Sequence, residues 1–326
     1  MTPDAMDNTG AQNRVPFRLV QANDELQCTW LGTYNNRFIE PFFDDTMRHL
    51  RITYPQNRGN LGTGSLQLMQ QEAQNINAAG PSVIIFHLSR CGSTLVSQLF
   101  ASSGRFIVLS EVPFFDDVLG LPLLVPGFDE SEIAALFASA LNLYSRKRFA
   151  EEENAILKTD CWHIFYYHTL RKMFPDVPFV LMYRSPNEVL TSHLRIAGRQ
   201  TVPELVDPRI FGLPGMPDVY QRDVYTASII QKMLAKFLEV SETDTQTLLV
   251  NYKEGPVNIV KKIAGFAKLA LSGDELAVME VRSRYHSKKP GELFGEEPAA
   301  GVPACLDEAM RLYELLEQKR NLDDRH

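Results

Sequence analysis

The hydrophobic pattern of this chain alternates between short continuous apolar runs and longer stretches in which apolar residues recur at helical spacing. The clearest instance covers residues 82–101. Residues 83–86 are all apolar, which is typical of a strand buried on both faces of a sheet. A polar turn follows, and from Thr94 onward the apolar residues have the period of an amphipathic helix. We therefore expect a strand, a tight turn and a helix.

The same alternation continues along the chain. It favours an α/β fold of three layers, in which a central parallel sheet lies between two layers of helices. Ahead of these elements, residues 15–34 are predicted to be strands, which indicates an N-terminal β-rich elaboration. We expect Ser131 to be the N-cap of one helix. Further strands are predicted at 106–109, 155–157, 177–183 and 247–250, and helices at 42–50, 66–76, 131–149, 161–174, 219–240, 256–269, 274–284 and 306–322.

The domain organisation predicted from this pattern has three parts. Residues 1–13 are polar and aperiodic, and we expect a disordered tail there. Residues 14–80 are the N-terminal elaboration, and residues 81–326 are one large domain that forms a compact unit with it. Residues 199–218 are rich in Pro and Gly and too long for a simple connection, so we expect a functional loop.

The polar turn at residues 87–93 is suited to bind a phosphate. Gly92 lets the backbone approach an anion closely, and the hydroxyl groups of Ser93 and Thr94 add donors. The positive end of the helix dipole faces the same volume. The turn therefore predicts a P-loop. However, an ATP-binding Walker loop needs Lys where this chain has Ser93, and the cation here is Arg90, two residues before Gly92.

Three more candidate residues follow predicted strands directly. They are Glu111, Lys158 and Arg184. Open parallel sheets bind their ligands at the carboxyl ends of the strands, so we expect these side chains near one crevice. A second strand-turn-helix begins at Arg184, and Ser192 lies two turns along its helix, where both side chains can meet one phosphate. The alternatives are a solvated loop carboxylate for Glu111 and a surface arginine for Arg184.

An Arg two residues before Gly-Ser-Thr, at the end of the first strand, resembles the 5′-phosphosulfate loop of the sulfotransferases that use 3′-phosphoadenosine 5′-phosphosulfate (PAPS). The order of the strand-end residues is also similar to that family, chiefly over residues 82–265. Arg90 and Glu111 are 21 positions apart, and Lys158 and Arg184 are 26 apart. These spacings resemble the tyrosylprotein sulfotransferase-like and bacterial branch. The resemblance implies a sulfotransferase-like P-loop fold, related to that of the P-loop NTPases.

The resemblance also implies a donor site and its residues. PAPS would be the sulfuryl donor, and no metal would be needed. Arg184 and Ser192 would bind the 3′-phosphate, and Tyr252 would pack near the adenine. The segment around Tyr252, Asn251-Tyr252-Lys253-Glu254, departs from the usual charge order of the family. The residues implied at the 5′-phosphosulfate are Arg90, Cys91, Gly92, Ser93 and Thr94.

Catalytic roles follow from the same resemblance. Glu111 would be the general base, while Lys158 and Arg90 would stabilise charge at the sulfuryl group and the leaving phosphate. Cytosolic sulfotransferases have a His where this chain has Asp160, which makes Asp160 the lesser candidate for the base. Lys288 and Lys289 are only a loose match to the C-terminal cofactor loop of those enzymes.

The composition of this chain of 326 residues excludes some classes of binding partner. Its net charge is −7, which argues against nucleic acid or an anionic membrane as a partner. Its four cysteines form no CxxC pair, so we expect neither zinc nor disulfides but a reducing cytoplasm. The chain shows no signal or membrane-spanning pattern. We expect a small-molecule acceptor, whose identity would be set by loops at 32–64, 112–128 and 199–220, and a homodimer stays open.

Two other functions compete with the sulfotransferase. One is a P-loop nucleotide or small-molecule kinase, which predicts dependence on ATP and Mg²⁺. The other is a nucleotide-binding protein that has kept the fold without catalysis. His163 and His168 lack the HExxH spacing of a zinc site, so we expect them to be packed or exposed without a metal.

Overall fold

The central feature of the computed structural model is a five-stranded parallel sheet with helices on its faces. The structure describes residues 13–22, 25–58, 62–125, 127–213, 221–285 and 301–323. The expected α/β fold with a central parallel sheet is confirmed. The predictions for residues 1–12, Lys288 and Lys289 lie outside the described residues. The strand order is β5 (Phe106–Ser110), β6 (Asn154–Lys158), β4 (Pro81–His87), β7 (Phe179–Tyr183) and β8 (Thr247–Asn251).

The chain divides into two compact units. The first unit contains Met1–Ser82, Phe100–Lys158 and Thr169–Pro175. The second contains Val83–Leu99, Thr159–His168 and Asp176–His326. Strands β5 and β6 belong to the first unit, and β7, β8 and most of β4 to the second. The predicted division into residues 14–80 and 81–326 stays a prediction.

The first unit also holds the predicted N-terminal strands. β1 (Arg14–Ala22) and β2 (Glu25–Gly32) form an antiparallel hairpin, and β3 (Thr63–Ser65), which the pattern did not predict, pairs with β2. The hydroxyl of Tyr144, the last residue of α6 (Glu130–Tyr144), donates to the backbone carbonyl of Pro16 on β1 and ties that helix to the hairpin. The unit's other helical elements are α2 (Phe43–Thr53), η1 (Pro55–Asn57), α3 (Leu66–Ala73), α5 (Pro113–Leu124), α6 (Glu130–Tyr144) and most of α7 (Tyr167–Met173).

Three predictions in the first unit are wrong. Asp129, and not Ser131, is the N-cap of α6, because its carboxylate accepts from the backbone of Glu132 while Glu132 bonds back in a capping box. The helix also ends at Tyr144, before the predicted residue 149. Residues 113–124, predicted as part of an acceptor loop, form helix α5, which Pro113 begins at its first position.

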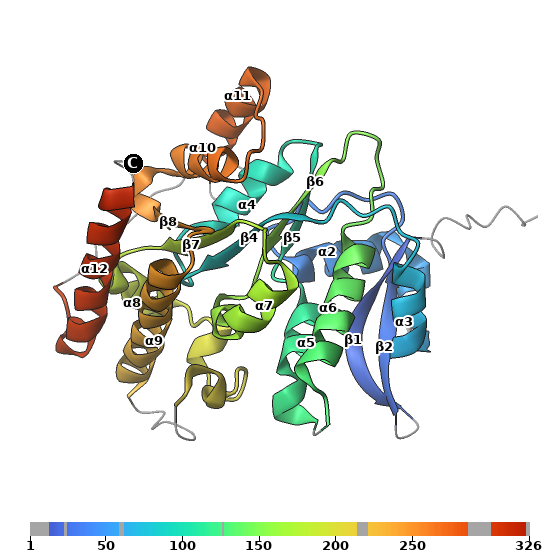
Figure 1. The fold of residues 1–326 in the computed structure, drawn as a ribbon, viewed down its shortest axis with the longest axis horizontal. Coiled ribbons are helices and arrows are strands. Elements are labelled where there is room, and N and C mark those ends of the chain that lie inside the picture. Colours follow the sequence, from blue (N-terminus) through green and yellow to red (C-terminus); the bar gives the residue numbers. More distant parts are fainter. Residues whose placement is uncertain are drawn as a thin grey trace, which may run out of the picture. The chain divides into compact units, whose positions relative to one another are not determined.

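The second unit contains the strand-turn-helix elements of the predicted phosphate site. The predicted helix at 161–174 begins as a 3₁₀ helix, and the predicted 199–218 loop contains two 3₁₀ turns. Helix α12 (Asp307–Asp323) packs along α9 (Arg222–Thr243) (Figure 1). The helical elements of this unit are α4 (Ser93–Ala101, all but its last two residues), η2 (Cys161–Tyr166), α8 (Pro186–Arg195), η3 (Arg199–Thr201), η4 (Pro208–Phe211), α9 (Arg222–Thr243), η5 (Tyr252–Glu254), α10 (Pro256–Phe266), α11 (Gly273–Arg282), η6 (Ala304–Leu306) and α12 (Asp307–Asp323).

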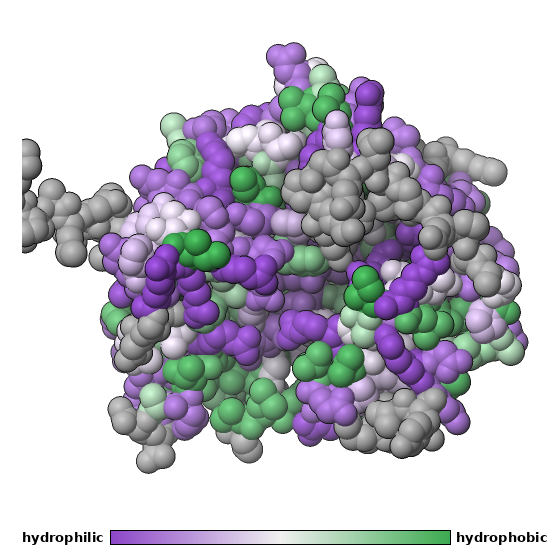
Figure 2. Space-filling view, turned by 180° about the vertical axis from the view of Figure 1, so that it is seen from behind, coloured by the Kyte–Doolittle hydropathy of each residue, from purple (hydrophilic) through white to green (hydrophobic). Residues whose placement is uncertain are grey.

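The apolar residues of the strands form the core. Residues 83–86 of β4 and all of β7 are buried, as their continuous apolar sequences predict. On the face seen in Figure 2, hydrophobic residues form several separate groups with hydrophilic residues between them. Within the described ranges, the structure contains no helix with the length and apolar character needed to cross a bilayer.

Candidate active site

The predicted phosphate loop joins β4 to α4 in the second unit. Arg90 and Gly92 both have positive φ angles, 64° and 81°. A Cβ atom added to Gly92 would lie 2.4 Å from two ring carbons of Tyr252. Glycine is therefore required at position 92 for two reasons. L side chains rarely adopt this φ, and the Tyr252 ring lies against the backbone.

The start of α4 places backbone donors and hydroxyl groups at the end of this loop. Ser93 and Thr94 are buried, and the carbonyl of Gly92 accepts from the third and fourth residues that follow it. N–H groups in the first turn of a helix have no acceptor within that helix, which is why such turns bind anions. Cys91 braces the loop, since its thiol donates to the Met182 carbonyl of β7 at 3.4 Å.

The neighbouring strand ends bring two more predicted cofactor residues together. The guanidinium carbon of Arg184, directly after β7, lies 4.4 Å from the ring centroid of Tyr252, directly after β8. Arg184 also donates to Glu188 at 2.9 Å, which fixes its plane. Because the Tyr252 ring lies against Gly92, residues from three strand ends form one cluster. We call Gly92, Arg184 and Tyr252 the Tyr252 cluster.

Two other predicted cofactor residues lie in the same unit. The guanidinium of Arg90 donates to the backbone carbonyl of Ile196, which follows α8, at 2.9 Å. Ser192 lies in the second half of α8 and is half-buried. Its role at a 3′-phosphate stays a prediction.

The first unit holds the other two predicted catalytic residues in direct contact. The side chain of Lys158 is 0% exposed, and its ammonium donates to the carboxylate of Glu111, which is 23% exposed. The backbone N–H of Glu111 donates to the Lys158 carbonyl at 2.8 Å and extends the β5–β6 pairing by one residue. The ring centroid of Phe42 lies 5.4 Å from the same ammonium. The buried lysine thus has one carboxylate and one aromatic face beside it.

The backbone of Glu111 is strained. Its φ is 53°, and Tyr34, Arg90 and Lys268 are the other non-glycine residues with positive φ in the described part of the chain. Such conformations cost about 1–3 kcal/mol and persist where the surrounding structure enforces them, often at functional sites. Two of these four residues are predicted catalytic residues.

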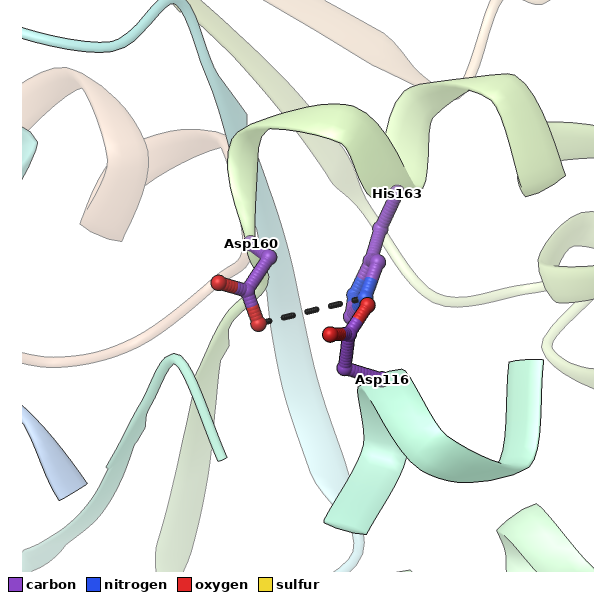
Figure 3. Close-up of side chains that lie close together, drawn as sticks. All are labelled: Asp116, Asp160 and His163. Atoms are coloured by element: carbon purple, nitrogen blue, oxygen red, sulfur yellow. Dashed lines mark ion pairs between the residues drawn. The ribbon is translucent and has the colours of Figure 1, made fainter. Parts of the chain in front are cut away.

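Asp160, the lesser candidate for the base, forms a buried pair in the second unit. Its carboxylate lies 3.9 Å from Nε2 of His163, and both residues are buried (Figure 3). Arg199 Nη1 lies 3.9 Å from the other carboxylate oxygen. Asp116, also drawn in Figure 3, belongs to the first unit. His163 is therefore a packed residue with an acidic neighbour.

Sequence reasoning missed the residues that hold Tyr252 in place. Asn251 and Glu254 form a capping box around η5, in which Asn251 accepts from the Lys253 backbone and Glu254 accepts from the Asn251 backbone. An Asn followed three residues later by Glu is a known signature of a helix start, so this pattern was available in the sequence. It also accounts for the charge order at Asn251-Tyr252-Lys253-Glu254.

Among the comparisons with known proteins, only the comparison with solved structures finds matches. No family model matches the chain, and no curated protein matches it. Sulfotransferase STF9 from Mycobacterium avium is 16% identical, with a TM-score of 0.47, over 86% of this chain and 85% of that chain. Sulfotransferase STF1 from Mycobacterium tuberculosis is 14% identical, with a TM-score of 0.46, over 84% and 85%.

A third similar structure is a sulfotransferase from Alicyclobacillus acidocaldarius. It is 15% identical, with a TM-score of 0.34, over 63% of this chain and 94% of that chain. All three identities are low and all three TM-scores lie below 0.5, so these likenesses assign no activity to this chain.

Proposed function

We propose that this chain is a sulfotransferase that transfers a sulfuryl group from PAPS to a hydroxyl or amine of a small-molecule acceptor. The observation that carries the proposal is the Tyr252 cluster. It combines a glycine whose backbone lies against an aromatic ring with a guanidinium stacked on that ring, beside a helix start. A nucleotide with two phosphate groups needs these groups together. A cytoplasmic location and the tyrosylprotein sulfotransferase-like and bacterial branch belong to the same proposal.

The residues present fit such a donor. The backbone at Gly92 has no room for a side chain, and Ser93 and Thr94 add hydroxyl groups at the helix start, which suits a 5′-phosphosulfate. Arg184 is held by Glu188 and stacks on Tyr252, so its fork is oriented for a 3′-phosphate. Arg90, Cys91 and Ser192 complete the proposed set.

The catalytic part of the proposal concerns Glu111 and Lys158. PAPS, when bound, supplies the sulfuryl group and leaves as adenosine 3′,5′-bisphosphate. Glu111 takes the proton of the acceptor hydroxyl on its carboxylate, a role worth roughly 10²–10⁴ in rate. Lys158 holds the Glu111 carboxylate before reaction and provides a positive charge where negative charge develops. Asp160 is the lesser candidate for the base.

The residue types of the loop favour this reaction over a kinase. A Walker loop needs Lys immediately after its last Gly, and Ser93 is there instead. Sulfuryl transfer, like phosphoryl transfer, depends on positioning and charge stabilisation, which Arg90 and Lys158 can provide without a metal.

Calorimetric binding of adenosine 3′,5′-bisphosphate without metal tests the donor site. Binding of ATP with Mg²⁺ is measured in parallel to test the kinase alternative. We expect the parent protein to bind the bisphosphate and Arg184→Ala to lose most of that affinity. Arg311→Ala is the matched control, because Arg311 is exposed and, among the described residues, its ion pair is with Glu308 on the same helix. It should bind as the parent does.

Each other outcome contradicts a part of the proposal. Binding of ATP with Mg²⁺ and not of the bisphosphate would indicate the kinase. Bisphosphate binding with no transfer of labelled sulfuryl groups to any of a panel of alcohols, phenols and amines would favour a nucleotide-binding protein without catalysis. If neither nucleotide binds, the proposed function is wrong.

A further inference from the structure

We propose that Glu317, on the C-terminal helix α12, is a positioning residue for the nucleotide site. It joins the carboxyl ends of β7 and β8 and so presets Arg184 and Tyr252 for a bound nucleotide. This inference rests on the proposed function, because it assigns Glu317 to the same site. Glu317 bonds to residues next to the Tyr252 cluster in the chain and is not proposed as a phosphate ligand.

One carboxylate oxygen of Glu317 binds the last residue of each strand. Its Oε1 accepts from the Tyr183 hydroxyl at 2.7 Å and from the Asn251 side-chain amide at 2.9 Å. Tyr183 and Asn251 are register partners in the parallel pairing of β7 with β8, and both are buried. The helix therefore fixes two strand ends at the same height through one atom.

The residues after these two partners belong to the Tyr252 cluster. Arg184 follows Tyr183, and Tyr252 follows Asn251. Their 4.4 Å cation–π contact depends on the relative height of the two strand ends. A change at Glu317 therefore acts on residues that directly precede Arg184 and Tyr252 in the chain, and so on both proposed ligand-binding side chains.

The surroundings of Glu317 hold its carboxylate in place. The residue is only 9% exposed, and a buried charge is stable only when it is paired and hydrogen-bonded. Arg320 Nε donates to Oε1 at 3.1 Å, and the ammonium of Lys253 donates to Oε2. Burial, followed by the nearby positive charge of Arg320, lowers the pKa of Lys253. Because Tyr183, Asn251, Lys253 and Arg320 all donate to it, the carboxylate of Glu317 has little freedom to move.

To test this role, Glu317→Ala is introduced into the parent and into Arg184→Lys, and the affinity of each protein for the bisphosphate is measured. We expect the dissociation constant to rise about 10-fold in the parent, the low end of what loss of an orienting residue costs at metal sites. In Arg184→Lys, whose stacked fork is already lost, we expect a much smaller rise, because the two residues act through one geometry. Glu317→Gln keeps the accepting oxygen and should recover most of the affinity.

Glu308→Ala is the matched control. Glu308 lies on the same helix, and its ion pair within the described part of the chain is with the exposed Arg311, so its removal should leave binding unchanged. An unchanged dissociation constant in a folded Glu317→Ala overturns the proposal. Equal weakening in both backgrounds also overturns it, since that indicates a general structural role. If Glu317→Ala does not fold, Tyr183→Phe replaces it, because it removes one hydroxyl and keeps the ring.

A separate measurement distinguishes failure of this inference from failure of the proposed function. If the parent binds no bisphosphate, the proposed function fails, and amide hydrogen exchange then tests the positioning role without a ligand. Faster exchange at residues 184–185 and 252–253 in Glu317→Ala than in Glu308→Ala supports that role. Equal exchange in the two variants overturns it.

Discussion

The ammonium of Lys158 donates a hydrogen bond to the carboxylate of Glu111, although 47 positions separate these residues in the chain. They meet because β5 and β6 are parallel neighbours, and Ser110, which precedes Glu111, is the register partner of Lys158. Both side chains therefore leave the carboxyl end of the same strand pair, where open α/β sheets carry their chemistry.

Glu111→Gln tests the proposed base. The amide keeps the shape and one accepting oxygen but cannot take a proton, so we expect kcat to fall by about 10²–10⁴. Bisphosphate affinity should stay within about twofold of the parent, because Glu111 is not proposed to bind the nucleotide. Steady-state kinetics and calorimetry measure the two quantities.

Two controls accompany this variant. Glu153→Gln removes an exposed carboxylate that pairs with Arg105 beside the opposite end of β6, and kcat should not change. Asp160→Asn tests the lesser candidate. A larger loss of kcat in Asp160→Asn than in Glu111→Gln would assign the base to Asp160 instead.

Gly92→Ala tests the loop geometry. The added Cβ meets the Tyr252 ring and the positive φ disfavours any side chain, so we expect the free energy of unfolding to fall by about 1–3 kcal/mol. Bisphosphate binding should weaken because the Tyr252 ring is displaced. Urea denaturation and calorimetry measure these effects.

Gly265→Ala is the control for the glycine prediction. Gly265 lies in helix α10, and nothing lies within 4 Å of an added Cβ. That substitution should raise the free energy of unfolding by about 0.5–1 kcal/mol, because alanine loses less entropy in a helix. If Gly92→Ala behaves like Gly265→Ala, the close approach of Tyr252 to the loop is wrong.

Arg184→Lys tests the stacked guanidinium. Lysine keeps the positive charge but has no planar fork to stack on Tyr252 or to bind a phosphate through two bonds. We expect bisphosphate affinity to fall about 10-fold, with binding still measurable. Arg209→Lys, at an exposed pair with Asp207, is the control. Equal affinity in Arg184→Lys and the parent would remove Arg184 from the phosphate site.

The buried thiol of Cys28 predicts a loss of stability at alkaline pH. Burial raises the pKa of Cys28 to about 12 from 9.0, although the charge of Arg14 lowers it in part. The unfolded chain ionises above pH 9 while the folded thiol stays neutral. The stabilisation is therefore complete below pH 9 and falls by up to about 1.4 kcal/mol per pH unit as the pH rises toward 12.

Urea denaturation from about pH 8 to about pH 10.5, on both sides of the unfolded thiol's ordinary pKa, measures this effect in Cys28→Ala and the parent. We expect a flatter pH dependence in Cys28→Ala. Leu31→Ala is the control, because it also opens a cavity in β2 but removes no titrating group. Its pH dependence should match the parent's. Identical slopes in Cys28→Ala and the parent would contradict the prediction.

The sequence by itself determined the local elements and the candidate side chains. Continuous apolar runs specified the buried parallel strands, and helical spacing specified most helices, because both patterns are local. Glu111, Lys158 and Arg184 were found from their places directly after predicted strands, and the phosphate-loop residues from the polar turn before a helix. Local patterns were less reliable at helix ends, since the Asp129 capping box competes with Ser131 and Pro113 begins a helix within a predicted loop.

Only the tertiary structure decided which of these residues meet. The contact of Lys158 with Glu111 requires the strand order, and the approach of Tyr252 to Gly92 requires the backbone path of two separate turns. Glu317 has a local partner in Arg320, but its partners Tyr183 and Asn251 are 134 and 66 positions away. Such contacts follow from how elements pack over long sequence separations, which hydrophobic spacing does not encode.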